Sequence, residues 1–255
     1  MDNQEFTPMD ITELVKCSED PTYFIENYCK IEHPVNGPQL LPMPNQGHQR
    51  KMIQSYHKNL KTIVLAPRQM LTTSTTCAYI LWHAIFKPNQ FILITSNAKI
   101  NAGESIQRIR FMYNNLPTWL KVPLGLSSLR DTIEFMNGSV ISSAAVSATT
   151  GRGRTVSLLY CDNFGNLTQN TAEPFWASIY PSIASFSKII ISSGACEQHK
   201  LYSHLWHDAL DGLNEFQPIK IEWDEWPSRD EIFKDMQIKN IGIDAWRREY
   251  ECIFN

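Results

Sequence analysis

Residues 61–86, KTIVLAPRQMLTTSTTCAYILWHAIF, decide the fold. Residues 62–66 form a short apolar run with β-branched side chains in its middle, which is typical of a buried strand. Pro67 marks a turn, a cluster of hydroxyl side chains follows, and apolar residues then recur every three or four positions up to Phe86. This order of strand, polar turn and helix is the layout of a phosphate-binding loop, in which free N–H groups at the helix start can hold phosphate oxygens.

The turn keeps only part of the chemistry of such a loop. A phosphate-binding loop needs glycine where the backbone approaches the phosphates, a lysine for the β- and γ-phosphates, and Ser or Thr for magnesium. Here Leu71 occupies the glycine position, Thr72 occupies the lysine position, and only the hydroxyl of Thr73 remains. From these residues alone, an ordinary α/β core unit is the more common interpretation, because this unit occurs in many folds.

The composition indicates an ordinary globular protein without a strong charge bias. The chain has 255 residues, 43% hydrophobic and 19% charged, and a formal net charge of −3. This length suits one large α/β domain or two small ones, and the charge argues against a strongly basic nucleic-acid-binding protein. The six cysteines form no CxxC pair and no metal-ligand spacing. We therefore expect reduced thiols, no signal peptide, and no membrane-spanning segment.

The rest of the chain predicts strands that alternate with helices. Further buried strands are expected at residues 91–95, 155–162, 188–193 and 218–223, and helices at 10–17, 20–29, 48–57, 98–115, 200–211 and 244–251. Continuous apolar strands in this pattern indicate a mainly parallel sheet with helices on both faces. Residues 132–142 predict a β-hairpin, because Asn137-Gly138 suits a two-residue I′ turn. Four prolines between residues 31 and 44 predict a loop.

One polar pair stands at the end of a predicted strand. In nucleotide-hydrolysing α/β proteins an Asp at this place orders magnesium, and a neighbouring Glu orients the attacking water. Asp162 fits the first role, but its neighbour is Asn163. An amide accepts a hydrogen bond, yet it neither takes a proton nor carries negative charge.

Other polar residues each allow two interpretations. Gln49 either hydrogen-bonds an adenine edge or faces solvent from its helix, and the second is more common. Arg152, which lies between two glycines, either presents its guanidinium on a mobile loop or belongs to an ordinary surface loop. We expect Arg108 and Arg110 to lie on a solvated helix face.

Several blocks match one family in the same order along the chain. They are CSEDPTYFIENYCKIEHPVNG (17–37), GHQRKMI (47–53), RQMLTTS (68–74), RIRFMYNNLPTWLK (108–121), TIEFMNGSVI (132–141), GRGRTVSLLYCDNF (151–164), KIIISSGA (188–195), IEWDEWPSRDE (221–231) and WRREYECIF (246–254). Over nearly its whole length the chain resembles the N-terminal ATPase domain of T4-like tailed-phage terminase large subunits, which are DNA-packaging motors. The family writes R-Q-L-G-K-T-T where this chain has RQMLTTS.

The resemblance implies a P-loop NTPase fold of the RecA/ASCE type, with a mainly parallel sheet, helices on both faces and a β-hairpin. Residues 1–46 would form N-terminal helices and an entry loop, and residues 47–255 the ATPase-like domain. The implied nucleotide-binding residues are Gln49 on the adenine side and Arg68, Gln69, Leu71, Thr72 and Thr73 at the phosphates. The implied catalytic positions are Asp162, Asn163 and Arg152, the last as a trans-acting arginine; Thr73 and Asp162 would serve magnesium, and Ser192, Ser193 and Gly194 the coupling motif.

Three departures fall on positions where catalysis needs a particular residue. The family's glycine is Leu71, its lysine is Thr72, and its catalytic glutamate is Asn163. We expect Leu71 to avoid the positive φ that a glycine takes readily. We also expect no nuclease activity, because the family's metal-dependent nuclease domain would follow residue 255.

Two functions from different classes fit these residues, and we expect hydrolysis to be very weak or absent. The first is a pseudo-ATPase that acts as a structural or regulatory subunit. The alternative is the active ATPase half of a split packaging motor, in which ATP hydrolysis drives translocation of double-stranded DNA. A fragment of a longer protein fits as well. The resemblance implies ATP and Mg²⁺ as ligands if binding is retained. It also implies a portal, a small terminase or another terminase subunit as partners, possible contact with double-stranded DNA, a ring homo-oligomer, and the host cytoplasm as location.

Overall fold

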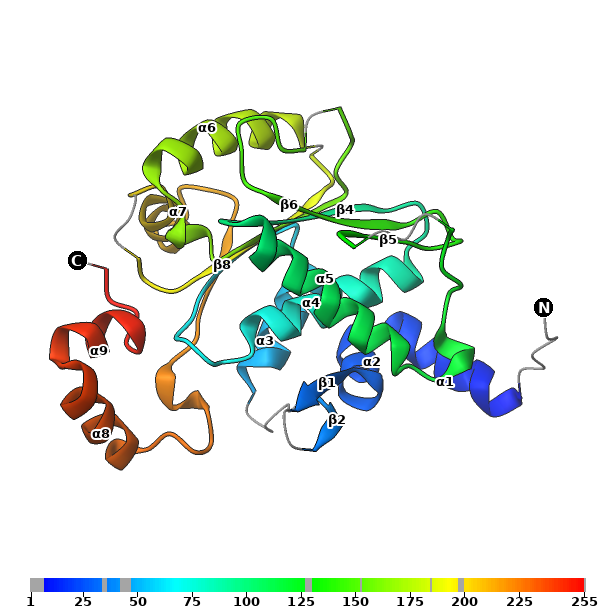
Figure 1. Ribbon diagram of the computed structural model, residues 1–255, viewed down its shortest axis with the longest axis horizontal. Helices are drawn as coiled ribbons and strands as arrows, with labels where there is room; N and C mark the ends of the chain where they lie inside the picture. Colours follow the sequence, from blue (N-terminus) through cyan, green and yellow to red (C-terminus); the bar gives the residue numbers. More distant parts are fainter. Residues whose placement is uncertain are drawn as a thin grey trace.

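A seven-stranded, mainly parallel sheet forms the centre of the molecule (Figure 1). The computed structural model describes residues 7–33, 36–41, 47–126, 130–151, 153–183, 185–196 and 200–254. The strand order is β5-β6-β4-β7-β8-β3-β9, and every neighbouring pair is parallel except β5 with β6. The strands are β3 (Lys61–Leu65), β4 (Phe91–Ser96), β5 (Thr132–Glu134), β6 (Val140–Ala145), β7 (Leu158–Asp162), β8 (Lys188–Ser193) and β9 (Gln217–Lys220).

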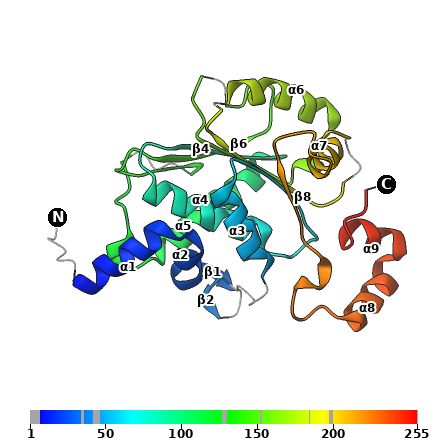
Figure 2. The same ribbon diagram turned by 180° about the vertical axis from the view of Figure 1, so that it is seen from behind.

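Helices cover both faces of this sheet, as Figures 1 and 2 show from opposite sides. One face carries α1 (Pro8–Glu19), α2 (Pro21–Tyr28), α3 (His48–Lys58), α4 (Thr72–Phe86) and α5 (Lys99–Asn114). The other carries α6 (Gln169–Ile179) and α7 (Lys200–Leu210). Alternate strand residues serve the two faces: Val64 packs with the first group of helices, and Ile63 and Leu65 with the second. The predicted α/β fold with a parallel sheet between two helical layers is confirmed.

The sequence located the central strands to within one to three residues of their ends. Residues 62–66 and 91–95 correspond to β3 and β4, and the long apolar runs before Asp162 and Ser193 correspond to β7 and β8. In the register, Leu65 lies opposite Ser193 and Asp162 opposite Ser192, so β3, β7 and β8 end at the same edge. Strand β8 separates β3 from β7.

The β-hairpin exists, but its turn is not the I′ turn that Asn-Gly predicted. The N–H of Gly138 donates to the carbonyl of Phe135 at 3.0 Å, and Gly138 has a φ of +83°, whereas Asn137 has no positive φ. The amide of Asn137 instead donates to the carbonyls of Ala84 and Ile85 at the end of α4. This tertiary contact fixes the turn, and pairing of β6 with β4 makes the hairpin part of the sheet.

The segment predicted as a loop contains a small second sheet. Strands β1 (Lys30–His33) and β2 (Gly37–Leu40) pair antiparallel, with Glu32 opposite Pro38. A proline fits here because a two-stranded sheet has only edge strands, where a missing N–H is tolerated. Pro34, Pro42 and Pro44 lie outside the described residues.

The described chain ends in two helices that lie beside the sheet, drawn in orange and red in Figure 1: α8 (Glu231–Ile241) and α9 (Ile243–Glu249). Fully buried Trp246 of α9 stacks on Tyr250 with ring centroids 4.5 Å apart. Four short 3₁₀ helices complete the described elements: η1 (Thr118–Leu120), η2 (Phe164–Asn166), η3 (Tyr180–Ser182) and η4 (Trp223–Glu225). Across the described ranges, we find no helix with the length and apolarity that crossing a membrane requires.

Candidate functional site

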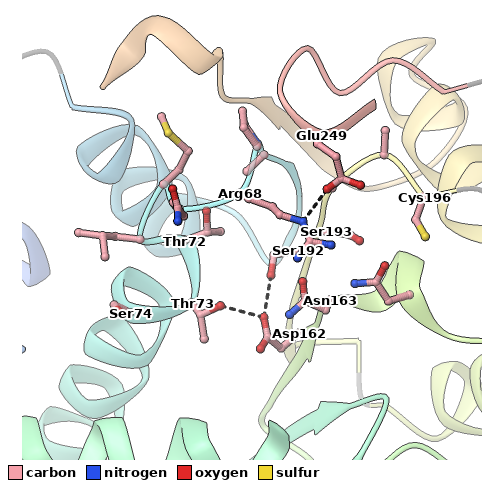
Figure 3. A pocket seen from close by; sticks show the side chains of 18 of the residues that line it. Arg68, Thr72, Thr73, Ser74, Asp162, Asn163, Ser192, Ser193, Cys196 and Glu249 are labelled. Atoms are coloured by element: carbon pink, nitrogen blue, oxygen red, sulfur yellow. Dashed lines mark hydrogen bonds and ion pairs between the residues drawn. The ribbon is translucent and has the colours of Figure 1, made fainter. Parts of the chain in front are cut away.

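A pocket of about 330 Å³ opens at the edge where β3, β7 and β8 end and α4 begins (Figure 3). The turn from β3 to α4 forms one wall, the segments after β7 and β8 form the opposite wall, and the end of α9 reaches the rim. Open parallel sheets bind their ligands in this place, outside the carboxyl ends of the strands.

The turn before α4 has the backbone shape of an anion-binding loop although it lacks glycine. Gln69 and Leu71 both lie in the left-handed region, with φ of 61° and 55°. Helix α4 begins directly after Leu71, so its first N–H groups have no partner within the helix and remain available for an anion. The expectation that Leu71 avoids a positive φ is therefore wrong. Each such conformation costs an L-residue about 1–2 kcal/mol.

Contacts from two other elements hold this turn in place. Nε2 of His48, at the start of α3, lies 2.8 Å from the carbonyl oxygen of Met70. The guanidinium of buried Arg229 donates to the carbonyl of Arg68 at 2.9 Å and contacts the Met70 sulfur. The surrounding structure thus stabilises a backbone shape that the sequence of the turn does not favour.

A hydroxyl and a carboxylate face each other across the pocket, as the sequence predicted. Oγ1 of Thr73, in the first turn of α4, donates to Oδ1 of Asp162 at 3.1 Å (Figure 3). The same oxygen accepts hydrogen bonds from the Tyr160 hydroxyl at 2.8 Å and from Ser192 Oγ at 3.5 Å. Burial raises the pKa of Asp162 above its ordinary value, even though hydrogen bonds from Tyr160 and Thr73 oppose this shift.

This pair fits a magnesium ion bound together with phosphates. No group of three His, Cys, Asp or Glu side chains in the described ranges is arranged to hold a metal without help. Magnesium keeps several water ligands and usually takes one or two protein oxygens plus substrate phosphates, so the Thr73 hydroxyl and the Asp162 carboxylate are suitable partners.

The residues that follow β7 and β8 form the opposite wall. Asn163 is exposed and has a φ of 53°, a conformation that Asn tolerates better than most residues. Oγ of Ser193 accepts a hydrogen bond from the N–H of Gly165 at 3.0 Å, and Ser192 Oγ lies 2.9 Å from the Tyr160 hydroxyl. The two wall segments are therefore connected to the sheet and to each other.

Every described cation that lines the pocket is an arginine: Arg68, Arg108 and Arg248. Two of them share one carboxylate. Arg68 Nε lies 2.5 Å from Glu249 Oε2 (Figure 3), and Arg248 Nε lies 3.2 Å from Glu249 Oε1. Partial burial opposes ionisation of Glu249, but these arginines outweigh it and hold the pKa of Glu249 below its ordinary value. Arg108 reaches the pocket from α5, where its Nη1 lies 3.4 Å from Ser74 Oγ.

Known proteins were compared with this chain by sequence family and by structure. No protein-family model matches it. The large terminase of bacteriophage HK97 matches with a TM-score of 0.70 and 15% identity, over 92% of this chain and 54% of that chain. A variant of the large terminase ATPase domain of Thermus phage P74-26 matches at 0.62 and 15% identity, over 81% of this chain and 93% of that chain. The large terminase of a second thermophilic bacteriophage, in complex with ADP, matches at 0.63 and 13% identity, over 84% of this chain and 54% of that chain.

The chain has the fold of a phage large-terminase ATPase domain. It spans about half the length of the HK97 terminase and of the ADP-bound terminase, and most of the length of the P74-26 ATPase domain. The resemblance that the sequence blocks indicated is confirmed at the level of the fold.

The pocket brings together most residues that the sequence singled out. They are Arg68, Gln69, Leu71, Thr72, Thr73, Asp162, Asn163, Ser192, Ser193 and Gly194. Gln49 is not among the residues that line this pocket. It is fully buried in α3, so the interpretation that it faces solvent is wrong. Arg152 lies outside the described residues. The roles assigned to all of these residues stay predictions.

Sequence reasoning missed three charged residues that line the pocket. Arg108 is exposed, as expected, but the surface on which it lies belongs to the pocket. Arg248 and Glu249 come from a helix far along the chain, and Glu249 is 181 residues from Arg68. No local pattern marks these three residues, because only the packing of α5 and α9 against the start of α4 brings them to the pocket.

Proposed function

We propose that this protein is a terminase large-subunit-like component of phage DNA packaging that binds a magnesium–nucleoside triphosphate and hydrolyses it very slowly or not at all. One observation carries the proposal: the pocket has the Thr73–Asp162 pair at 3.1 Å, while the residue after Asp162 is a neutral amide. Such a chain acts as a structural or regulatory subunit, with a portal, other terminase subunits or double-stranded DNA as its partners in the host cytoplasm.

Three features support nucleotide binding. The turn before α4 has two left-handed residues and leads into free helical N–H groups, which suit phosphate oxygens. Among the described residues, the pocket lining contains more guanidiniums than carboxylates. Structures of the second thermophilic-phage terminase contain ADP and ATP-γ-S, and the fold of that protein is similar.

The lack of two chemical groups supports slow turnover. Thr72 places a neutral hydroxyl where a lysine would neutralise the β- and γ-phosphates, and Asn163 offers no carboxylate to orient the attacking water. Each element of this kind is typically worth about 10² to 10⁵ in rate. When bound, Mg²⁺ would neutralise charge on the phosphates. Thr73 and Asp162 would position it, and the first N–H groups of α4 would hold phosphate oxygens.

Binding and turnover measured on the same protein test the proposal. We expect calorimetric titration with ATP-γ-S and Mg²⁺ to show binding, and a phosphate-release assay with ATP to show no turnover at motor rates. Asp162→Ala should weaken the magnesium-dependent part of binding. Turnover at ordinary motor rates that Asp162→Ala removes would overturn the pseudo-ATPase proposal, and no binding of ATP-γ-S would overturn nucleotide binding.

Glu249 favours a second candidate function, the active half of a split packaging motor. It is the one carboxylate besides Asp162 among the described residues that line the pocket. If phosphates displaced Arg68 and Arg248 from it, this carboxylate would be free to orient water. The two functions differ in the effect of Glu249→Gln: an active motor that uses Glu249 loses its turnover, while a pseudo-ATPase has none to lose.

A further inference from the structure

We propose that Arg108, on α5, binds the phosphates and supplies part of the positive charge that a lysine at the Thr72 position supplies in ordinary phosphate-binding loops. This inference rests on the proposed function, nucleotide binding at this pocket, and it identifies the side chain that holds the phosphates. The cation would thus come from a neighbouring helix and not from the loop.

The position of Arg108 matches this role. Its guanidinium Nη1 lies 3.4 Å from the Oγ of Ser74, which is two residues beyond Thr72 in the first turn of α4. Arg108 lines the same pocket as Thr73 and Asp162. Its charge also acts on Asp162 and is one of the influences that lower the pKa of that carboxyl. The guanidinium is therefore close to the place where both the magnesium pair and the free helical N–H groups lie.

Arg108 is also the pocket cation that remains available to a ligand. Arg68 and Arg248 both contact Glu249, whereas no described carboxylate lies within ion-pair distance of Arg108. At 3.4 Å its contact with Ser74 exceeds the usual 2.7–3.2 Å of an N–H···O hydrogen bond, so this contact is weak. Among the described residues of this lining there are three guanidiniums and two carboxylates, and the guanidinium without a carboxylate within ion-pair distance is that of Arg108.

The space around Arg108 allows its side chain to move toward a ligand. A second cavity of about 660 Å³, lined by α5 and β1, shares Leu71, Ser74 and Arg108 with the first. Arg108 therefore lies where the two cavities meet, and it is exposed. A guanidinium suits this role because it binds phosphate with two parallel N–H···O bonds and stays charged.

Calorimetric titration with ATP-γ-S and Mg²⁺ tests the assignment on the purified protein. We expect Arg108→Gln to weaken binding about tenfold or more, since charge-assisted hydrogen bonds to phosphate are among the strong ones. Arg110→Gln is the matched control, because Arg110 lies on the same helix and its Nη2 donates to the carbonyl of Thr132 at 2.7 Å, away from the pocket. It should bind within about twofold of the natural protein.

A second variant tests whether Arg108 compensates for the lysine that the loop lacks at position 72. Adding Thr72→Lys to Arg108→Gln should restore most of the lost affinity, and the same addition to the control Arg110→Gln should raise affinity much less. Arg108 is exposed, so Arg108→Gln should unfold thermally like the natural protein, and Arg108→Lys should retain most of the affinity. Unchanged affinity of Arg108→Gln in a protein that binds ATP-γ-S overturns the assignment alone. No binding by the natural protein overturns the proposed function together with it.

Discussion

Leu71 and Gln69 hold left-handed backbone in the turn before α4, where glycine would be free of strain. Leu71 also packs at the edge of the core, so its side chain repays part of that cost. We predict that Leu71→Gly leaves the free energy of unfolding unchanged or raises it by up to about 1 kcal/mol, because relief of strain offsets the lost packing. Urea unfolding measures this difference.

Leu71→Ala is the matched control for that variant. Alanine loses the same packing but keeps a Cβ and hence the cost of the left-handed conformation. It should therefore be less stable than Leu71→Gly by about 1 kcal/mol. Equal loss of stability in both variants would mean that packing, and not backbone strain, decides the stability of this turn.

Asp162 depends on the hydroxyl groups around it. Tyr160 is fully buried and donates to Asp162 Oδ1 at 2.8 Å, so Tyr160→Phe keeps the ring and removes the donor. We predict a loss of about 1–2 kcal/mol in the free energy of unfolding at neutral pH. The variant should also raise the pKa of Asp162 further, because an ionised carboxylate needs donors more than a protonated one does.

The sign of the pH dependence follows from that pKa. Burial raises the pKa of Asp162 in the folded protein, so the ionised group costs stability above that pKa, and protonation relieves the cost as the pH falls through it. The free energy of unfolding that Tyr160→Phe removes should accordingly be largest at neutral pH and smaller at about pH 4. Urea unfolding of both proteins at the two pH values measures it; a penalty that grows on acidification would contradict the prediction.

At the scale of elements, one arginine joins the C-terminal helices to the turn before α4. Arg229 is buried, and its guanidinium lies 5.3 Å from the ring centroid of Phe233 and 5.5 Å from that of Tyr250 while it donates to the carbonyl of Arg68. These contacts connect α8 and α9 to the loop that forms the pocket wall. Arg229 is a positioning residue, because it acts on the loop and not on a ligand.

Arg229→Met should loosen this connection. The apolar side chain fills similar space but leaves the Arg68 carbonyl without its donor, so we expect a loss of about 2 kcal/mol in the free energy of unfolding. Hydrogen exchange should become faster in α8 and α9, and ATP-γ-S binding weaker. Lys234→Met is the control, since Lys234 lies over Trp223 and Trp246 without bonding the loop. Equal protection of α8 and α9 in both variants would contradict this link.

Burial on both faces explains which strands the sequence located. Strands β3, β4, β7 and β8 are covered on both faces and read as continuous apolar runs, which is why the sequence located them. The sequence did not predict helices α6 and α8. Helix α8 has no buried residue, whereas α6 buries Ala172, Phe175 and Ile179, so burial does not explain which helices were missed. The sequence predicted those pocket residues that stand in a short motif at the end of a strand or the start of a helix, such as Thr73 and Asp162. Pocket residues were missed where only the packing of another helix brings a residue to the pocket, as for Arg108 from α5 and Glu249 from α9.

At the scale of the whole molecule, the residues proposed to bind phosphates and the residue at the proposed water-orienting position lie on different walls of the pocket. Leu71 and Thr72 belong to the turn that would hold phosphates, and Asn163 belongs to the opposite wall after β7. Turnover needs phosphate binding and water orientation at the same time, so the effects of these positions should not add independently. Substitutions in the phosphate-binding turn alone should therefore change nucleotide binding without restoring turnover. A substitution of Asn163 alone should leave the protein inactive.

We predict that Asn163→Glu alone stays inactive and that Leu71→Gly with Thr72→Lys improves ATP-γ-S binding without motor-rate turnover. All three substitutions together should give slow, magnesium-dependent hydrolysis, because the new lysine neutralises phosphate charge and the new carboxylate orients water. Asn163 has a φ of 53°, which glutamate tolerates less well, so the position of the new carboxylate should limit the hydrolysis rate of the triple variant. Phosphate release from ATP measures it, and Asp162→Ala added to the triple variant should abolish it. Equal turnover in the Asn163→Glu variant and the triple variant would show that the phosphate-binding turn of the natural chain is already complete.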